Sequence, residues 1–220
     1  QELIAIPPPF DLLPTLWRGV GVTVQLTLFG SALAFGVALI IGFGRLSRFR
    51  LIRLLATVYM ELFRGTTLLV QLFWAYFVLP HFGVEFTEMQ IGVLVLGLNY
   101  GAYGSEIVRG SILAVPNTQI EAGIALNMSP WQIMRRIILP QALLMMLPPF
   151  GNLLIELLKG TALVSMITLA DLTFQGTLMR VSTLRSLEIF SLVLIIYFLL
   201  AYPLTLALRL FERKMAEGRS

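Results

Sequence analysis

Five long runs without a charged side chain constrain what this chain of 220 residues can fold into. Each run has 17 to 26 residues, and together they cover Gly19–Gly44, Gly65–Val84, Met89–Ser105, Ile137–Ile155 and Ile189–Leu208. A helix of about 20 apolar residues crosses the hydrocarbon core of a bilayer. The sequence therefore predicts an all-α integral membrane protein with five transmembrane helices. A shorter apolar run, Gly160–Ala170, cannot span and is expected to be re-entrant or interfacial.

The composition supports one membrane domain. Hydrophobic residues make up 57% of the chain and charged residues 13%, which is far more apolar than a soluble domain. The chain has no cysteine, which excludes disulfides, thiolate catalysis and cysteine metal sites. Because no repeat or linker divides it, we predict a single transmembrane domain over residues 1–220. The expected spans are 19–44, 58–80, 89–112, 133–156 and 187–209.

The basic residues predict how the chain is oriented. In a five-span arrangement, eleven of them fall on one side, namely Arg45, Arg48, Arg50, Arg53, Arg109, Arg135, Arg136, Arg209, Arg213, Lys214 and Arg219. Basic residues close to span ends stay in the cytoplasm. We therefore expect the N-terminus outside and the C-terminus inside. Nucleic-acid binding is disfavoured, since the arginines flank apolar spans and form no continuous stripe.

The polar segment 117–127, between the third and fourth spans, is predicted to form a short cytoplasmic helix. Ile120 and Ile124 share one face of it, and Ala122 and Gly123 are small enough for a partner to approach closely. Such a helix fits a groove of a soluble protein. An ordinary interfacial helix lying on lipid has the same pattern, so both interpretations stay open at this point.

Local signals predict where this short helix ends and the next begins. Asn127 tolerates the left-handed conformation that terminates helices. Ser129 is suited to cap the following helix, with Pro130 at its first position.

Three acid–base pairs at one spacing lie at the edges of the spans: Glu61 and Arg64, Glu106 and Arg109, and Glu156 and Lys159. Residues three apart share a helical face, so each pair is expected to neutralise itself. The first two are predicted to be structural. The third follows Pro148 and Pro149, which are expected to break or kink their helix, and it offers a zwitterion one carboxylate and one ammonium group. A structural role is equally compatible with that third pair.

Uncharged polar residues inside the spans have two possible roles. They can line a substrate route with weak contacts, or they can form hydrogen bonds between helices. The candidate substrate route comprises Gln71, Asn99, Tyr103, Asn152, Glu156 and Lys159. We expect no metal site.

The segment that begins at Glu121 resembles a known signature. Glu121-Ala122-Gly123, then Asn127, then Ile137 and Leu139-Pro140 resemble the cytoplasmic motif Glu-Ala-Ala-x3-Gly-x9-Ile-x-Leu-Pro of ABC-importer permeases. This sequence departs from the motif at two positions. Gly123 replaces the second alanine and is also small, and Asn127 replaces the glycine and also tolerates the left-handed backbone conformation. The resemblance extends over residues 15–212 to the polar amino-acid uptake branch, through Glu61–Thr66, Leu69–Gln71, Ala102–Gly110, Leu139–Ala142 and Leu158–Thr161 with Val164-Ser165. A narrower similarity to permeases for ectoine-type solutes covers Pro149–Phe174.

The resemblance implies a type I importer in the bacterial inner membrane. Its partners would be cytoplasmic ATPase subunits, an external solute-binding protein and a second permease subunit, identical or different. The segment at 117–127 would be the coupling helix, with Ile120, Glu121, Ala122, Gly123, Ile124, Leu126 and Asn127 contacting the ATPase. This chain would bind no cofactor and would not be an enzyme, because it has no phosphate-binding loop. ATP and Mg²⁺ would belong to the partner.

Other classes of membrane protein remain possible from the residues alone. A secondary transporter or channel would have the segment 117–127 lying on lipid, and a membrane scaffold would transport nothing.

Overall fold

The computed structural model describes residues 10–217, with side chains described up to Lys214, and all regular secondary structure in that range is helical. The predicted all-α membrane fold is confirmed. In chain order the elements are η1 (Phe10–Leu12), α1 (Leu13–Arg45), α2 (Arg50–Gly65), α3 (Leu68–Phe73), η2 (Trp74–Val78), η3 (Leu79–Phe82), α4 (Glu88–Leu113), α5 (Asn117–Ala125), α6 (Pro130–Ile133), η4 (Met134–Ile138), α7 (Leu139–Gly160), η5 (Thr161–Ile167), α8 (Leu172–Thr183) and α9 (Ser186–Glu217). Arg219, one of the arginines used to predict orientation, lies outside the described residues.

Four stretches of helix are long and apolar enough to cross a membrane: Phe10–Arg45, Glu88–Leu113, Pro130–Ile167 and Ser186–Lys214. A fifth is obtained if Arg50–Gly65 and Leu68–Phe82 cross together, although the two are bent by 102°. The predicted span 58–80 thus contains a sharp break between α2 and α3.

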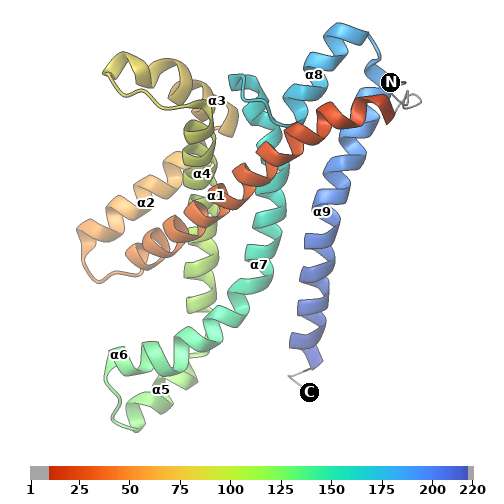
Figure 1. Cartoon of the computed structure of the whole chain (residues 1–220). Coiled ribbons are helices and arrows are strands. Elements are labelled where there is room, and N and C mark those ends of the chain that lie inside the picture. Colours follow the sequence, from red (N-terminus) through yellow and green to blue (C-terminus); the bar gives the residue numbers. More distant parts are fainter. Residues whose placement is uncertain (1–9, 218–220) are drawn as a thin grey trace.

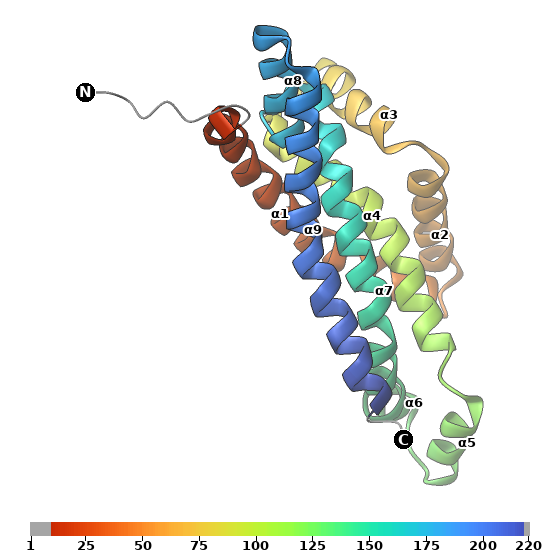
Figure 2. The same cartoon turned by 90° about the vertical axis from the view of Figure 1, so that its right-hand side faces the viewer.

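The bundle has two distinct ends. α4, α7 and α9 run side by side, and α1 crosses them obliquely (Figures 1 and 2). The short helices α5 and α6 lie at one end, which we call the α5 end. The helix α8 and the start of α1 lie at the opposite end, the α8 end.

Small residues let α1 and α4 approach closely. A Cβ atom added to Gly97, Gly101 or Gly42 would come within 2.5–2.6 Å of a side chain on the facing helix. Gly30, Ala34 and Ala38, small residues spaced four apart on α1, are also buried in the bundle. This is the usual way in which membrane helices pack, since lipid supplies no hydrophobic force between them.

The proline pair in the fourth span does not end its helix. α7 continues through Pro148 and Pro149 to Gly160, so of the two predicted outcomes, a broken or a kinked helix, the break is wrong. Each proline removes one backbone donor, but Met146 and Leu153 on either side of the pair are buried in the bundle. Packing against neighbouring helices lets membrane helices tolerate proline.

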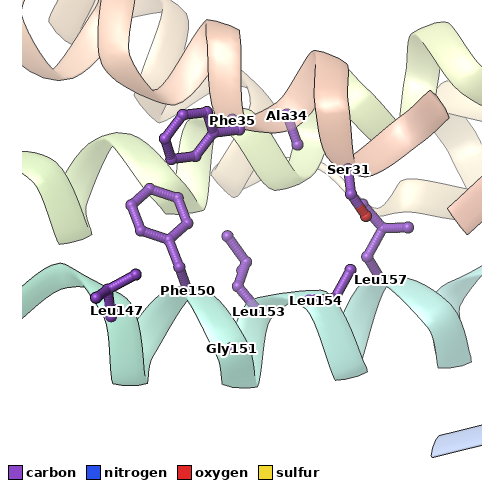
Figure 3. Close-up of a pocket in the computed structure, with 9 residues that line it drawn as sticks. All are labelled: Ser31, Ala34, Phe35, Leu147, Phe150, Gly151, Leu153, Leu154 and Leu157. Atoms are coloured by element: carbon purple, nitrogen blue, oxygen red, sulfur yellow. The ribbon is translucent and has the colours of Figure 1, made fainter. Parts of the chain in front are cut away.

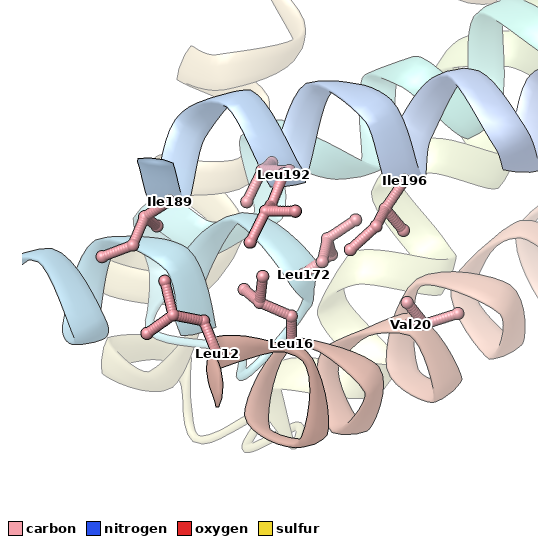
Figure 4. Close-up of a cluster of buried hydrophobic side chains, with 8 residues drawn as sticks. Leu12, Leu16, Val20, Leu172, Ile189, Leu192 and Ile196 are labelled. Carbon is pink, nitrogen blue, oxygen red and sulfur yellow. The ribbon is translucent and has the colours of Figure 1, made fainter. Parts of the chain in front are cut away.

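The segment after α7 is also helical over most of its length. The 3-10 helix η5 extends α7, and its Val164 and Ile167 are fully buried beside α3 and α4. α8 follows, capped by the side chain of Asp171, which accepts a hydrogen bond from the Phe174 amide. Leu172 then packs in an apolar cluster with Leu12, Leu16 and Ile189 of η1, α1 and α9 (Figure 4).

Candidate functional site

Two amide side chains tie the break between α2 and α3 to α4. The Nδ2 atom of Asn99 donates to the carbonyl of Phe63 at 3.1 Å and to the Oε1 atom of Gln71 at 3.0 Å. Gln71 Nε2 donates to the same Phe63 carbonyl at 3.0 Å. The last carbonyls of a helix have no partner within it, so these amides satisfy the end of α2. The hydrogen-bonding role is therefore observed for Gln71 and Asn99.

A polar cavity of about 500 Å³ opens beside this joint. Such a volume lies within the range of roughly 300–1,000 Å³ found for small-molecule sites. α2 and the turn after it contribute Arg64 and the hydroxyls of Thr66 and Thr67, while the other polar lining residues are Asn99, Tyr100 and Tyr103 of α4 and Glu156 of α7. Opposite charges therefore line one cavity, from two different helices.

A close contact fixes the α7 side of this cavity. The hydroxyl of Tyr100 donates to the backbone carbonyl of Glu156 at 3.0 Å. A Cβ atom on Gly160 would lie 2.4 Å from that hydroxyl oxygen. Gly160 is thus needed for Tyr100 to reach α7, which places the Glu156 backbone against α4.

The structure brings three of the six predicted route residues together in the cavity: Asn99, Tyr103 and Glu156. Gln71 lies behind Asn99 and lines a separate, mainly apolar cavity between α3 and α4. Asn152 and Lys159 lie outside the cavity, but they are exposed on the same stripe of α7 as Glu156. Within the described part of the chain, Glu156 and Lys159 form no ion pair.

By contrast, the cavities beside α1, α3 and α9 are mainly apolar. The one between α1 and α7, of about 310 Å³, is lined by leucine and phenylalanine side chains, with Ser31 as its polar residue (Figure 3). It offers a polar substrate no charged group.

An ion cluster adjoins the polar cavity on the α5 side. The carboxylate of Glu106 lies 2.9 Å from an Nη1 atom of Arg45, 3.3 Å from that of Arg64 and 3.9 Å from that of Arg109. The predicted pair of Glu106 and Arg109 is confirmed. The predicted pair of Glu61 and Arg64 is wrong, because Arg64 turns toward Glu106 on α4.

Sequence reasoning missed Arg45 and Arg64 as members of one cluster. The guanidinium of Arg64 also stacks over the ring of Tyr103, 5.2 Å from its centroid. The available signal was the position of Arg64 directly before Gly65-Thr66, where the helix breaks. A charged side chain at such a break faces a cavity more readily than lipid.

At the α5 end, the termination signals act as predicted. Asn127 is left-handed, with φ of 54°. The amide of Met128 donates to the carbonyl of Gly123, and the amide of Asn127 donates to that of Ile124, which is the Schellman arrangement. Ser129 and Gln132 form a reciprocal capping box, with Pro130 at the start of α6.

Some residues of α5 are buried against the bundle, and others are exposed. Gly123 is buried, and a Cβ atom there would lie 2.9 Å from Ile133 and 3.1 Å from Ile137. Its small size thus serves packing against α6 and η4 and not, as we expected, approach by a partner. Ile120 is half-buried against the core, whereas Glu121 and Ala122 are exposed.

Large apolar side chains are exposed beside them. Ile124 is 62% exposed and Leu126 75% exposed, and Trp131 on α6 is 70% exposed. Together with Glu121 and Ala122 they form what we call the α5 surface.

Comparison with protein families and relatives supports one assignment. The family model described as "Binding-protein-dependent transport system inner membrane component" matches residues 17–217. The probable amino-acid ABC transporter permease protein y4tF of Sinorhizobium fredii is 43% identical over 215 residues, covering 95% of this chain and 90% of that protein. The glutamine transport system permease protein GlnP of Escherichia coli is 36% identical, covering 92% of this chain and 94% of GlnP.

Further similarities agree with that assignment. The L-cystine transport system permease protein TcyB of Bacillus subtilis is 36% identical, covering 94% of this chain and 91% of TcyB. A chain from the crystal structure of an amino acid ABC transporter with histidines superposes with a TM-score of 0.88 at 37% identity, covering 92% of this chain and 94% of that one.

Proposed function

The chain belongs to the family of inner-membrane components of binding-protein-dependent transport systems, and we propose that its polar cavity and its α5 surface are the working parts of an importer. It is a multi-pass permease subunit of an amino-acid ABC importer. It is not catalytic, since ATP hydrolysis takes place in a separate subunit. The family implies an ATPase and a binding protein as its partners.

The α5 surface is the element that docks on the ATPase. Its exposed Ile124 and Leu126 find no partner within the described chain, and Glu121 lies beside them. We propose accordingly that the α5 end and the C-terminal end of α9 lie in the cytoplasm and the α8 end outside, an orientation that the distribution of arginines supports. A short helix presented in this way fits a groove of a soluble partner.

The polar cavity is the substrate route, and a zwitterionic amino acid is the substrate class. Asn99, Tyr103 and Glu156 supply acceptors and donors there, with Asn152 and Lys159 along the same stripe of α7. Polar residues on an exposed face of a membrane helix are costly against lipid. We infer that this stripe faces an aqueous passage shared with a second permease subunit.

An amino acid is favoured over ectoine as the substrate. The relatives described above are named for amino acids, glutamine and cystine among them. The local similarity of residues 149–174 to ectoine permeases carries less weight than relatives that cover nine-tenths of the chain.

The docking role is tested by reversing one charge on the α5 surface. Glu121→Lys is expected to abolish uptake by proteoliposomes holding the complete importer, while the permease still inserts and ATP hydrolysis no longer responds to substrate. The matched control is Glu212→Lys, the same charge change at an exposed position on α9, which should leave uptake unchanged. Undiminished uptake with Glu121→Lys would argue against docking.

The cavity is tested by Glu156→Gln, which keeps the shape of the side chain and removes its charge. Uptake should fall at least tenfold or the preferred amino acid should change. An unaltered rate and preference would make Glu156 a structural residue.

A further inference from the structure

We propose that Arg64 binds the carboxylate of the transported amino acid and that it does so by leaving Glu106. The inference rests on the proposed function of the polar cavity and assigns the residue that recognises one end of the substrate. When the substrate arrives, the contact between Arg64 and Glu106 inside the protein is lost.

The ion cluster has more positive than negative charge. One carboxylate, that of Glu106, serves the guanidinium groups of Arg45, Arg64 and Arg109. The Nε atom of Arg45 is buried without a hydrogen-bond partner among the described residues. The cluster therefore has two uncompensated positive charges on the α2 side of the cavity, opposite the carboxylate of Glu156 on α7. A carboxylate that enters the cavity on the Arg64 side meets a favourable field.

Arg64 is the member of the cluster that can change partner. Its side chain is 40% exposed and lines the cavity, whereas that of Arg45 is 9% exposed. Its distance to Glu106 is 3.3 Å, longer than the 2.9 Å of Arg45. Its other contacts are with the Met60 sulfur and the Tyr103 ring, which a guanidinium can keep while it turns.

Glu106 remains paired after such an exchange. Removing one partner of a buried ion pair is costly, because it leaves an uncompensated charge. Here Arg45 and Arg109 stay beside Glu106, so its carboxylate is never left alone. Because three arginines surround one carboxylate, separating Arg64 from Glu106 costs little free energy.

The cavity has the chemistry of both ends of an amino acid. Arg64 comes from α2, and a guanidinium binds a carboxylate through two parallel hydrogen bonds. Glu156, from α7, is an acceptor for the ammonium group. Thr66 and Thr67 line the same cavity beside Arg64. A ligand with one carboxylate and one ammonium is thus held between two helices.

The exchange has a consequence for the fold. The contact between Arg64 and Glu106 joins the end of α2 to α4, directly before the 102° bend. Once the substrate replaces Glu106, this tie between α2 and α4 is lost. Occupancy of the cavity is thereby transmitted to the joint between α2 and α3.

The test measures ligand binding by the permease–ATPase complex in lipid nanodiscs without the binding protein, as thermal stabilisation. The probes are the labelled standard amino acid that the complete wild-type importer takes up and its decarboxylated amine. Wild type should be stabilised by the amino acid and not by the amine. Arg64→Gln should lose at least tenfold in apparent affinity for the amino acid, and Arg64→Lys should lose less.

Two variants separate this role from a structural one. Arg53→Gln, an exposed arginine of the same helix α2 that lies outside both the cluster and the cavity, should bind like wild type. Glu106→Gln should bind the amino acid several-fold more tightly, because it removes the competing carboxylate. If Glu106→Gln does not fold, Glu106→Asp, whose shorter side chain draws the carboxylate back from Arg64, should show the same direction.

Two results would overturn the inference: unchanged binding by Arg64→Gln, or weaker binding by a folded Glu106 variant. Failure of the wild-type importer to take up any standard amino acid would instead contradict the proposed substrate class. The two failures are therefore distinguishable.

Discussion

α5 and α8 are both short helices that lie between spans, at opposite ends of the bundle, but they are held very differently. α8 is capped by the fully buried Asp171, whose carboxylate also accepts from the hydroxyl of Tyr197 at 3.3 Å. The amide of Leu172 donates to the hydroxyl of Thr23 at 3.2 Å. α5 has no side-chain cap at its start, and its one buried residue is Gly123.

Of the two helices, α8 alone finds its packing and hydrogen-bond partners within the described part of this chain. α8 has its polar groups satisfied and its apolar side chains in a core shared with α1 and α9. α5 has a well-defined end, but Ile124 and the adjoining Leu126 remain exposed. A helix of nine residues is not stable by itself in water. The contacts that α5 lacks are therefore the ones that a partner would supply.

The largest effect is expected from Gly19→Ala, at the contact between α1 and the start of α8. The added Cβ would lie 2.7 Å from the carbonyl oxygen of Asp171 and from the Cα of Leu172. These are backbone atoms held by the cap, so they cannot yield, and overpacking of this kind costs about 3 kcal/mol. The measurement is thermal unfolding in detergent. Gly21→Ala, with nothing within 4 Å, is the control and should not lower stability.

A second effect is a dependence of stability on pH from Asp171. Burial raises the pKa of its carboxyl to about 6, from an ordinary value of 3.8. The folded state therefore binds this proton more tightly than the unfolded state does. The stabilisation is fully present below about pH 4 and is lost as the pH rises to about 6, with a total of at most about 3 kcal/mol.

Asp171→Asn supplies the comparison for this pH dependence. Asparagine still caps a helix but does not titrate. Melting temperatures between pH 4 and pH 7 should slope in wild type and be flatter in the variant. An identical slope in both proteins would mean that Asp171 is not its source.

The smallest effect is expected from Gly123→Ala on α5. The added Cβ meets the Cγ1 atom of Ile133 and the terminal Cδ1 atom of Ile137, side-chain atoms that can shift more easily than backbone. Alanine also favours a helix over glycine by about 1 kcal/mol. The free energy of unfolding should change by less than about 1 kcal/mol. A loss as large as that of Gly19→Ala would show that α5 is as tightly packed as α8.

The sequence predicted features that are set locally. Runs without charge indicated an all-helical membrane protein. Asn127 marked the end of α5 and Ser129 the start of α6, because caps depend on a few neighbouring residues. α8 was missed even though Asp171 stands at its start, since the surrounding mixed charge resembles a loop.

Features set by distant residues were not predictable. The spacing of Glu61 and Arg64 shows that they share a helical face, but Arg64 is closer to Glu106 on another helix. The same holds for Arg45, which meets Glu106 only because α1 and α4 pack along glycines. Gly123 packs against Ile133 of α6 and Ile137 of η4, a contact that depends on the direction in which the chain continues after α5.

The most direct test of the docking role uses the absence of cysteine in this chain. Ile124→Cys introduces a single thiol on the α5 surface, to which a photo-crosslinker is attached in the complete importer during uptake. The account predicts a crosslink to the ATPase from residue 124 and none from Leu178→Cys on α8, an exposed position at the opposite end. An importer that transports while residue 124 never joins the ATPase would contradict it.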